Sequence, residues 1–557
     1  SMAAGSLGGK GRGLAFVNTL IYNFNFSNLI EGIHIRTPKT VIIGTDEFDQ
    51  FMVNNKLYDL VHEERNYKLI QKYFLKAKLT PGLEKKLKTF LKLIYKPIAV
   101  RSSSLLEDSI NQPFSGIFNT FLLPNNNVNF NTRFRQTANA IKMVYASIYS
   151  DDARSYFEAV NFKVEDEQMA IVLQEVVGRQ HDKYFYPHIS GTAQSHNFYP
   201  YAHMKPVEGF ALAALGLGHY VVEGDKSFRF SPAYPELEIN TSKYLFKNSQ
   251  TWFYAIDLAR EKINLRKGDL AGLIKLDVSE AEKHKTLNHL ASVYFQENDR
   301  LEPGLEKAGP RILNFSNILK YSYIPLAQTI SVLLDVVKEA FGSPVEIEYA
   351  VDLNKDDDGK ASFYLLQVKP LLGAATDYRI DLKTLDPNKI ILYAKKSMGN
   401  GKIQDINDII YVKPDKFNRT KTEQMAKEIE ELNNLMVRDN TKYVLMGPGR
   451  WGTRDKFIGI PVNWPQISNA KVIVEMSLKD FPLDASLGSH FFHNVTSMNV
   501  GYFSVNHTSK NDFIMWDILE KQEVVRETEY FKHVCFCPGL EILMDGKKRT
   551  SIIMFND

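Results

Sequence analysis

A lysine among glycines opens the chain, at Gly8, Gly9, Lys10 and Gly11. Glycine lets the backbone approach a ligand closely, so main-chain N–H groups and the Lys10 ammonium could both reach phosphate oxygens. The segment is not a Walker A loop, which would have glycine at Ala4 and serine or threonine at Gly11. Taken alone, a flexible glycine terminus with an incidental lysine accounts for it equally well.

A second candidate for phosphate binding is Arg101, which follows the apolar run Ile98–Val100. A guanidinium at a strand end can bind a phosphate through two hydrogen bonds. Taken alone, such an arginine is more often a surface ion-pair partner. A glycine-containing turn next to a hydroxyl follows, with Gly116 and Thr120, and the combination favours phosphate binding.

The third candidate is a polar strand face in the run Val345–Val351. Glu346 and Glu348 alternate with apolar residues and so lie on one face, and an antiparallel partner strand would bring Gln367 and Lys369 opposite them. Magnesium takes one or two protein oxygens and completes its shell with phosphates and water, which Glu348 and Gln367 could satisfy. The alternative interpretation is a solvated polar strand face.

The elements that must position these residues are strands interleaved with helices, which predicts a mixed α/β or α+β fold. Expected strands are Thr40–Gly44, Ile98–Val100, Met169–Val177, Val345–Val351, Ser362–Val368, Ile390–Ala394 and Tyr443–Met446. Expected helical segments are Tyr67–Lys76, Leu83–Ile94, Phe134–Tyr156 as one helix, Asp257–Phe295 for most of its length, Leu326–Phe341 and Thr420–Val437.

The bulk composition limits the function classes. At 557 residues the chain is too long for one core, so we expect roughly two to four domains. A formal charge of +3 is small for this size and gives no reason to expect a nucleic-acid or acidic-membrane partner. The longest apolar stretches are short or carry charged residues, so no membrane span is expected.

The two cysteines, Cys535 and Cys537, are interpreted as strand residues in a reducing compartment. The N-terminus shows no signal-peptide pattern, so we expect a cytoplasmic protein. Since the glycine motif follows Ser1 and Met2 almost at once, with no strand ahead of it, we expect the natural protein to continue upstream with a further domain.

In chain order, the motifs GGKG, AVRSS, FSGIFNTF, QEVV, HISGTAQS, ALGLGHYVVEG, IEYAVD and YLLQVKP resemble the nucleotide-binding domain of the pyruvate phosphate dikinase and phosphoenolpyruvate synthase family, which includes rifampicin phosphotransferase. The resemblance covers roughly residues 5–372. It implies an ATP-grasp fold in residues 1–373, with ATP between two α+β lobes, roughly 1–120 and 121–373, and Mg²⁺ at the phosphates. The character of the sequence changes after Gly373, so residues 374–557 are expected to form a separate C-terminal α+β domain.

The resemblance also implies roles for individual residues. Lys10 and Arg101 would hold phosphates, Gly116 and Thr120 would lie on the phosphate loop, Gln174 with Glu175 and Val177 would lie at the adenine hinge, and Glu348 and Gln367 would bind magnesium. Lys369 stands where the family usually has arginine, which keeps the charge and loses the two-pronged geometry.

The C-terminal domain departs from the family pattern, because neither the phosphohistidine carrier nor the substrate barrel is recognisable in it. The loop Gly447–Asp455, with Arg450 and Trp451, suits an anion or a flat ligand. His490 follows Gly488 and Ser489 and is a candidate phosphate carrier, although a structural histidine is the more common case. No group of histidines has regular ligand spacing, so no transition-metal site is assigned.

The leading hypothesis is an ATP-dependent phosphotransferase in which Lys10, Arg101, Lys369 and Mg²⁺ position the phosphates and neutralise their charge. The phosphate would pass to His490 or directly to an unidentified acceptor at the C-terminal domain. Two alternatives stay open, a nucleotide-sensing regulatory module with little turnover and an ATP-grasp ligase that activates a carboxylate. The oligomeric state is also open.

Overall fold

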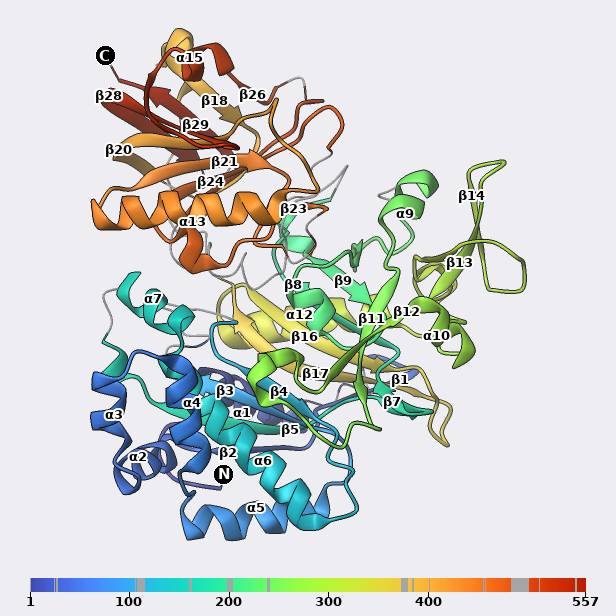
Figure 1. Ribbon diagram of the computed structural model, residues 1–557. Helices are drawn as coiled ribbons and strands as arrows, with labels where there is room; N and C mark the ends of the chain where they lie inside the picture. The colour runs from blue at the N-terminus through green and yellow to red at the C-terminus, as the bar shows by residue number, and fades with distance from the viewer. Residues whose placement is uncertain are drawn as a thin grey trace.

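The computed structural model describes most of the chain and shows helices and strands throughout (Figure 1). The described residues are 2–24, 26, 29–105, 107, 116–159, 163–197, 204–237, 241–371, 379–382, 385–399, 401–453, 455, 457–481, 500–509, 511–545 and 548–556. The expected α+β class is confirmed. Within these ranges, none of the helices combines the length and the apolar character needed to cross a membrane.

A four-stranded antiparallel sheet, in the order β2-β5-β3-β4, forms the first core. Its strands are β2 (Thr40–Ile43), β3 (Ile98–Ser104), β4 (Thr120–Leu123) and β5 (Met169–Glu175), and the helices of this part are α1 (Gly8–Asn23), α2 (Thr45–Asn54), α3 (Leu57–Glu63), α4 (Tyr67–Lys76), α5 (Pro81–Leu93), α6 (Phe130–Ala146) and α7 (Asp151–Ala159). Helix α5 begins where Thr80 accepts a hydrogen bond from the Leu83 N–H, and it buries Leu87 and Leu91. The expected helix at Tyr67–Lys76 is confirmed.

The segment expected as one helix, Phe134–Tyr156, is divided in the structure. Helix α6 ends in the 3₁₀ turn Ser147–Tyr149, and α7 starts after Ser150, whose backbone is extended. The Ser150 hydroxyl accepts a hydrogen bond from the Ala153 N–H and so caps the new helix. The prediction of one continuous helix was therefore wrong, because Ser150 caps a new helix at this point.

A six-stranded sheet, in the order β1-β17-β16-β8-β9-β10, forms the second core. Its strands are β1 (Ile33–Arg36), β8 (Ile189–Gln194), β9 (Phe210–Ala214), β10 (Phe228–Phe230), β16 (Val345–Asp352) and β17 (Ala361–Pro370). Helix α12 (Leu326–Phe341) packs on β16; it starts after Pro325 and ends at Gly342 in the left-handed conformation, as the sequence predicted. Helix α1 contacts both β3 and β17 and so links the two sheets, while the exact division into lobes stays a prediction.

Two smaller sheets flank this core. Their orders are β12-β11-β7-β6 and β14-β13-β15, built from β6 (Arg179–His181), β7 (Tyr184–Tyr186), β11 (Trp252–Asp257), β12 (Leu273–Asp277), β13 (Ala291–Phe295), β14 (Arg300–Pro303) and β15 (Arg311–Leu313). The expectation that Asp257–Phe295 is largely helical was therefore wrong. Antiparallel pairing of β12 with β11 outweighs the helix propensity of its residues, and only the short α10 (Val278–Lys283) is α-helical there.

The C-terminal part forms a ten-stranded sheet, which lies at the top of Figure 1 with α13 (Thr422–Arg438) along one side. Its strands are β18 (Ile390–Ala394), β19 (Lys396–Met398), β20 (Gly401–Val412), β21 (Tyr443–Pro448), β24 (Ala470–Met476), β25 (Gly501–Val505), β26 (Phe513–Ile514), β27 (Glu523–Glu527), β28 (Phe531–Asp545) and β29 (Thr550–Phe555). Strands β20, β21, β24 and β25 are parallel neighbours. Cys535 and Cys537 lie on β28, as expected. The domain boundary near Gly373 lies outside the described residues and stays a prediction.

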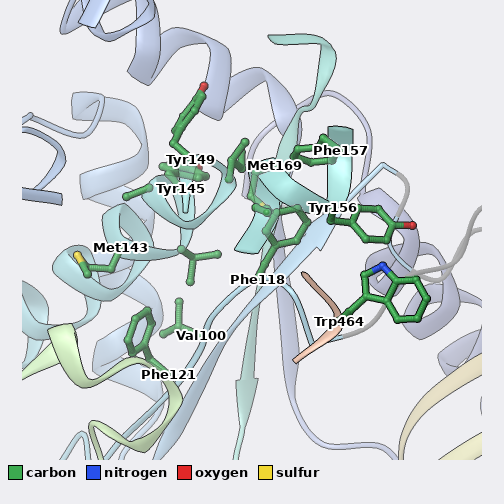
Figure 2. Packing of buried hydrophobic residues seen from close by; sticks show 14 of the residues in the cluster. Val100, Phe118, Phe121, Met143, Tyr145, Tyr149, Tyr156, Phe157, Met169 and Trp464 are labelled. Carbon is green, nitrogen blue, oxygen red and sulfur yellow. The ribbon is translucent and has the colours of Figure 1, made fainter. Parts of the chain in front are cut away.

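One apolar cluster joins the C-terminal part to the rest of the molecule. It contains Trp464, from the 3₁₀ turn Trp464–Ile467, together with Tyr156 and Phe157 of α7 (Figure 2). All three side chains are buried, and the turn contacts α7. The two parts of the chain therefore share a core rather than a solvated boundary.

Candidate functional site

The hairpin of β16 and β17 presents the polar residues that the sequence marked. Glu346 opposes Lys369 and Glu348 opposes Gln367 across the antiparallel pair, as predicted. Gln367 has no exposed surface and Lys369 is 4% exposed. The alternative of a solvated strand face is excluded, because these side chains are buried. A buried charge without a partner would cost too much free energy.

Arg101 and Lys369 lie on either side of the Glu348 carboxylate. Lys369 Nζ is 2.6 Å from Glu348 Oε1, and Arg101 Nη2 is 3.5 Å from Glu348 Oε2. The Arg101 guanidinium also donates to Gln367 Oε1, and to Gln174 Oε1 at 3.2 Å. Four strands, β3, β5, β16 and β17, are thus connected through one arginine.

The charges of this cluster nearly balance. Lys369 Nζ is also 3.8 Å from Glu346 Oε1, so two cations, Arg101 and Lys369, face two carboxylates, Glu346 and Glu348. A polyphosphate entering here would meet little uncompensated positive charge. A cation bound to the carboxylate would free both basic side chains to contact phosphate oxygens.

Lys10 is held in a second buried pair on the other side of Arg101. Its ammonium pairs with Glu107 and donates to Ser102 Oγ at 3.3 Å. The glycines beside it do not form a loop, since they begin α1 and pack on Ser103. Gly8 has φ +67°, and a Cβ there would lie 1.9 Å from the Ser103 carbonyl oxygen, so only glycine fits.

All ten residues proposed to contact nucleotide line a single cavity. They are Lys10, Arg101, Gly116, Thr120, Gln174, Glu175, Val177, Glu348, Gln367 and Lys369. The remaining wall is largely apolar and includes Ala99, Leu122, Val176, Leu217 and Leu273. A cavity that combines a charged cluster with a largely apolar remaining wall fits a ligand that has a flat ring and an anionic tail.

The expected hinge lies at the end of β5. The Glu175 N–H donates to the Lys39 carbonyl and the Val176 N–H to the Pro97 carbonyl, both at 2.9 Å. Glu175 also pairs with Lys96 at 3.2 Å. These bonds fix the backbone that leads to Val177, so the strand end is a rigid wall of the cavity.

Two polar residues of the wall were missed by the sequence reasoning, His219 and Asp269. Asp269 Oδ1 accepts a hydrogen bond from the Thr120 N–H at 2.8 Å, although the two residues are 149 positions apart. No local pattern marks Asp269. His219 lies in the motif ALGLGHYVVEG, which was quoted for the family resemblance, but no role was assigned to it.

A buried carboxyl group lies behind Lys10 and Glu107. Glu167 Oε1 accepts from the Leu105 N–H at 3.0 Å, whereas Oε2 has no hydrogen-bond partner among the described residues. Burial raises the pKa of Glu167 to about 7, with a smaller contribution from the nearby Glu107 charge. This carboxyl group therefore titrates near neutral pH.

In the C-terminal loop the described residues Arg450 and Trp451 contact the protein itself, while Arg454 lies outside the described residues. Trp451 is 1% exposed, its backbone N–H donates to Glu475 Oε1 at 2.9 Å, and its ring packs in the core. Arg450 is buried and donates to the Gly224 carbonyl at 2.6 Å. The indole is thus unavailable for stacking on a ligand. His490, the proposed carrier, lies outside the described residues.

Comparison with known proteins identifies the same part of the chain. The family model "Pyruvate phosphate dikinase, AMP/ATP-binding domain" matches residues 4–379. A similar protein is the uncharacterized phosphotransferase YvkC of Bacillus subtilis (strain 168), which is 30% identical over 191 residues. That alignment covers 34% of this chain and 20% of the relative, so the chain spans about a fifth of the length of YvkC.

Proposed function

This chain belongs to the family of the pyruvate phosphate dikinase AMP/ATP-binding domain, and on that premise we propose that it binds Mg–ATP in the cavity of Arg101 and Glu348 and transfers a phosphoryl group. The proposal rests on one observation, that residues from distant parts of the chain meet at the same cavity. Side chains from residue 10 to residue 369 line one cavity that combines a charged cluster with a largely apolar remaining wall. In this proposal the four-stranded and six-stranded sheets are the two lobes of an ATP-grasp-type fold.

The phosphate end would be organised by three basic side chains. Lys10, Arg101 and Lys369 each hold a carboxylate now, and each would exchange that contact for phosphate oxygens when nucleotide enters. Thr120, fixed by Asp269, would supply a hydroxyl beside them. The adenine ring would occupy the apolar end against Val177. Catalysis would then rest on positioning and on preorganised charge.

Magnesium fits the oxygen atoms at the hairpin. Glu348 and Gln367 lie in register and would hold the ion. Buried oxygens nearby lack partners among the described residues: Thr192 Oγ1, on the strand position opposite Glu348, and Gln194 Oε1, opposite Glu346. Orphaned buried oxygens next to a carboxylate are typical of a site completed by an ion or by water. When bound, magnesium would neutralise phosphate charge and orient the phosphates.

The first test is nucleotide binding measured by calorimetry with a non-hydrolysable ATP analogue. We expect one site, with affinity that rises when Mg²⁺ is added. Glu348→Gln should remove most of the magnesium dependence while leaving magnesium-free binding in place. Binding that is absent from the wild-type chain in the presence of Mg²⁺ would contradict the proposal.

The phosphoryl acceptor is the second question, and we propose that it is His490 or a substrate held by the C-terminal part. Labelling with ATP that carries a labelled terminal phosphate should give an acid-labile protein adduct if a histidine is the carrier. His490→Ala should abolish this label, with His493→Ala as the matched control. A label that survives His490→Ala removes His490 from the mechanism.

A second candidate function is a nucleotide-sensing module, and the contact of Arg450 with Gly224 favours it. Gly224 follows the helix α8 (His219–Val222), whose first residue lines the cavity. Closure around nucleotide could therefore be transmitted to the C-terminal sheet through this bond. Arg450→Met, compared with the exposed Arg419→Met, should change the nucleotide dependence of C-terminal hydrogen exchange. Tight binding with negligible turnover in the wild-type chain would favour this reading.

A further inference from the structure

Three potential metal ligands from distant parts of the chain meet at the edge of the cavity. They are His219, Glu223 and Asp269, and one ligand atom from each lies within 4.8 Å of the others. His219 Nδ1 and Glu223 Oε1 are 3.9 Å apart, and the two residues are four positions apart in the chain, about one helical turn. Asp269 arrives from the separate 3₁₀ segment Leu265–Leu270. The fold, not the local sequence, creates this group.

Two of the three side chains, Asp269 and His219, are positioned by neighbours outside the group. Asp269 Oδ1 accepts the Thr120 N–H at 2.8 Å, and a carboxylate has room for further ligands on its other lone pairs. The His219 ring packs edge-on against Tyr254, with ring centres 4.9 Å apart. Ligands that are oriented by second contacts are a common property of metal sites.

A further observation points to a ligand at this wall. Ser190 Oγ is buried, lines the same cavity, and has no hydrogen-bond partner among the described residues. It lies 4.0 Å from the place where a Cβ on Gly218 would stand, immediately before His219. An unsatisfied buried hydroxyl costs free energy unless water or a bound group completes it.

From this geometry we propose that His219, Glu223 and Asp269 form a second divalent-cation site, distinct from the Glu348 and Gln367 pair. One imidazole nitrogen and two carboxylates favour Mn²⁺, Co²⁺ or Zn²⁺ over Mg²⁺, which prefers oxygen ligands. Bonds of about 2.1 Å place ligand atoms about 3–4 Å apart, so modest side-chain rotations close the group around an ion. Two carboxylates also match the charge of one divalent ion.

The location gives this cation a role. His219 and Asp269 line the same cavity as Glu348 and Gln367, and Asp269 accepts a hydrogen bond from the Thr120 backbone N–H. A cation here would stiffen the segment that carries Thr120 and add positive charge next to the phosphate end. This role rests on the proposed nucleotide function, whereas metal binding by the three residues does not.

The test uses Co²⁺ as the probe, because its visible absorption reports ligand type. The full chain, stripped with a chelator and without nucleotide, is titrated with CoCl₂. We expect one equivalent with a nitrogen-containing ligand spectrum that persists in a large excess of Mg²⁺. His219→Ala and Asp269→Asn should weaken Co²⁺ binding by about 100-fold. Asp269→Asn keeps an oxygen for the Thr120 N–H, so loss of binding in this variant is not explained by misfolding.

The matched control is Asp358→Asn, an exposed carboxylate outside the cavity, which should leave the Co²⁺ spectrum unchanged. A spectrum that is insensitive to His219→Ala and Asp269→Asn, or one that Mg²⁺ displaces with equal affinity, overturns the proposal. ATP-analogue binding measured on the same samples separates the two ideas. Cobalt binding without nucleotide binding would keep the cation site and reject the nucleotide function, and the reverse result would do the opposite.

Discussion

Two glycine-rich basic segments of this chain have different fates, and both carry a residue suited to anion binding. In Gly8–Gly11 the Lys10 side chain reaches the cavity, whereas in Gly447–Gly452 the Arg450 side chain bonds to a main-chain carbonyl. The glycines of both segments serve close packing. A Cβ on Gly447 would lie 2.4 Å from the Trp451 ring, as a Cβ on Gly8 would collide with Ser103.

This difference shows that the residue composition of a motif does not by itself identify a ligand site. Lys10 lines a cavity that Arg101, Gln367 and Lys369 reach from strands β3 and β17. Trp451 belongs to a core because its own strand and β24 enclose it. Convergence of distant residues on a cavity is the stronger criterion, and it can be tested by mutating each segment.

The largest effect expected is loss of stability on Trp451→Ala. Removal of a buried indole leaves a cavity and costs about 3–5 kcal/mol in the free energy of unfolding. Chemical denaturation of the C-terminal part should show it, while nucleotide affinity changes little, because Trp451 does not line the cavity. Trp516→Ala is the control, since this half-buried indole should cost less. A loss of nucleotide affinity with unchanged stability would reverse the assignment of the two segments.

Arg101→Ala should have the opposite effect: a large loss of nucleotide affinity and a small change in stability. Charge-assisted hydrogen bonds contribute about 1.5–3 kcal/mol each, so ATP-analogue affinity should fall by about 100-fold. Calorimetry measures this, and Arg36→Ala is the matched control, because Arg36 forms an exposed pair with Asp356 outside the cavity. Arg101→Lys should recover only part of the affinity, since it restores charge without the planar fork. Equal effects at Arg36 and Arg101 would argue against a localised phosphate site.

Much of the region around the cavity could be predicted, because the sequence patterns that mark its strands and helices are local. Alternation predicted the β16–β17 register, and helical spacing predicted α12 over Leu326–Phe341. The order of the motifs identified the ten cavity residues, which no single motif could have done.

The rest could not be predicted because it depends on tertiary contacts. Asp269 reaches Thr120 only after the 3₁₀ segment Leu265–Leu270 and β4 pack together, and the Trp451 N–H finds its partner Glu475 on β24, which follows it in the chain. The segment Asp257–Phe295 has helix-forming residues, yet β11 recruits β12 as a partner. Pairing across a sheet outweighs propensity where the strands are short.

A smaller effect is expected from Glu167→Gln, and it depends on pH. Since burial raises the folded-state pKa of Glu167 from 4.5 to about 7, the unfolded chain loses this proton first as pH rises. Stability should therefore fall between about pH 4.5 and 7, by roughly 3 kcal/mol in total. Glutamine removes the titration, so the variant should be the more stable chain at pH 8 and about equal at pH 4.5. Denaturation at both pH values measures the difference, and a stability gap that is independent of pH would contradict a raised pKa.

The smallest effect, and the most informative about turnover, is expected from Lys369→Arg. Lys369 pairs with Glu348 at 2.6 Å and is nearly buried, so arginine keeps the charge and adds a second donor toward phosphate. If lysine limits phosphoryl transfer, ATP turnover should rise by about fivefold with little change in analogue affinity. Lys369→Met controls for the charge and should lower both quantities. If turnover stays negligible in Lys369→Arg while analogue affinity is preserved, the sensing module is favoured instead. In that case the lysine at position 369 is not the cause of the low turnover.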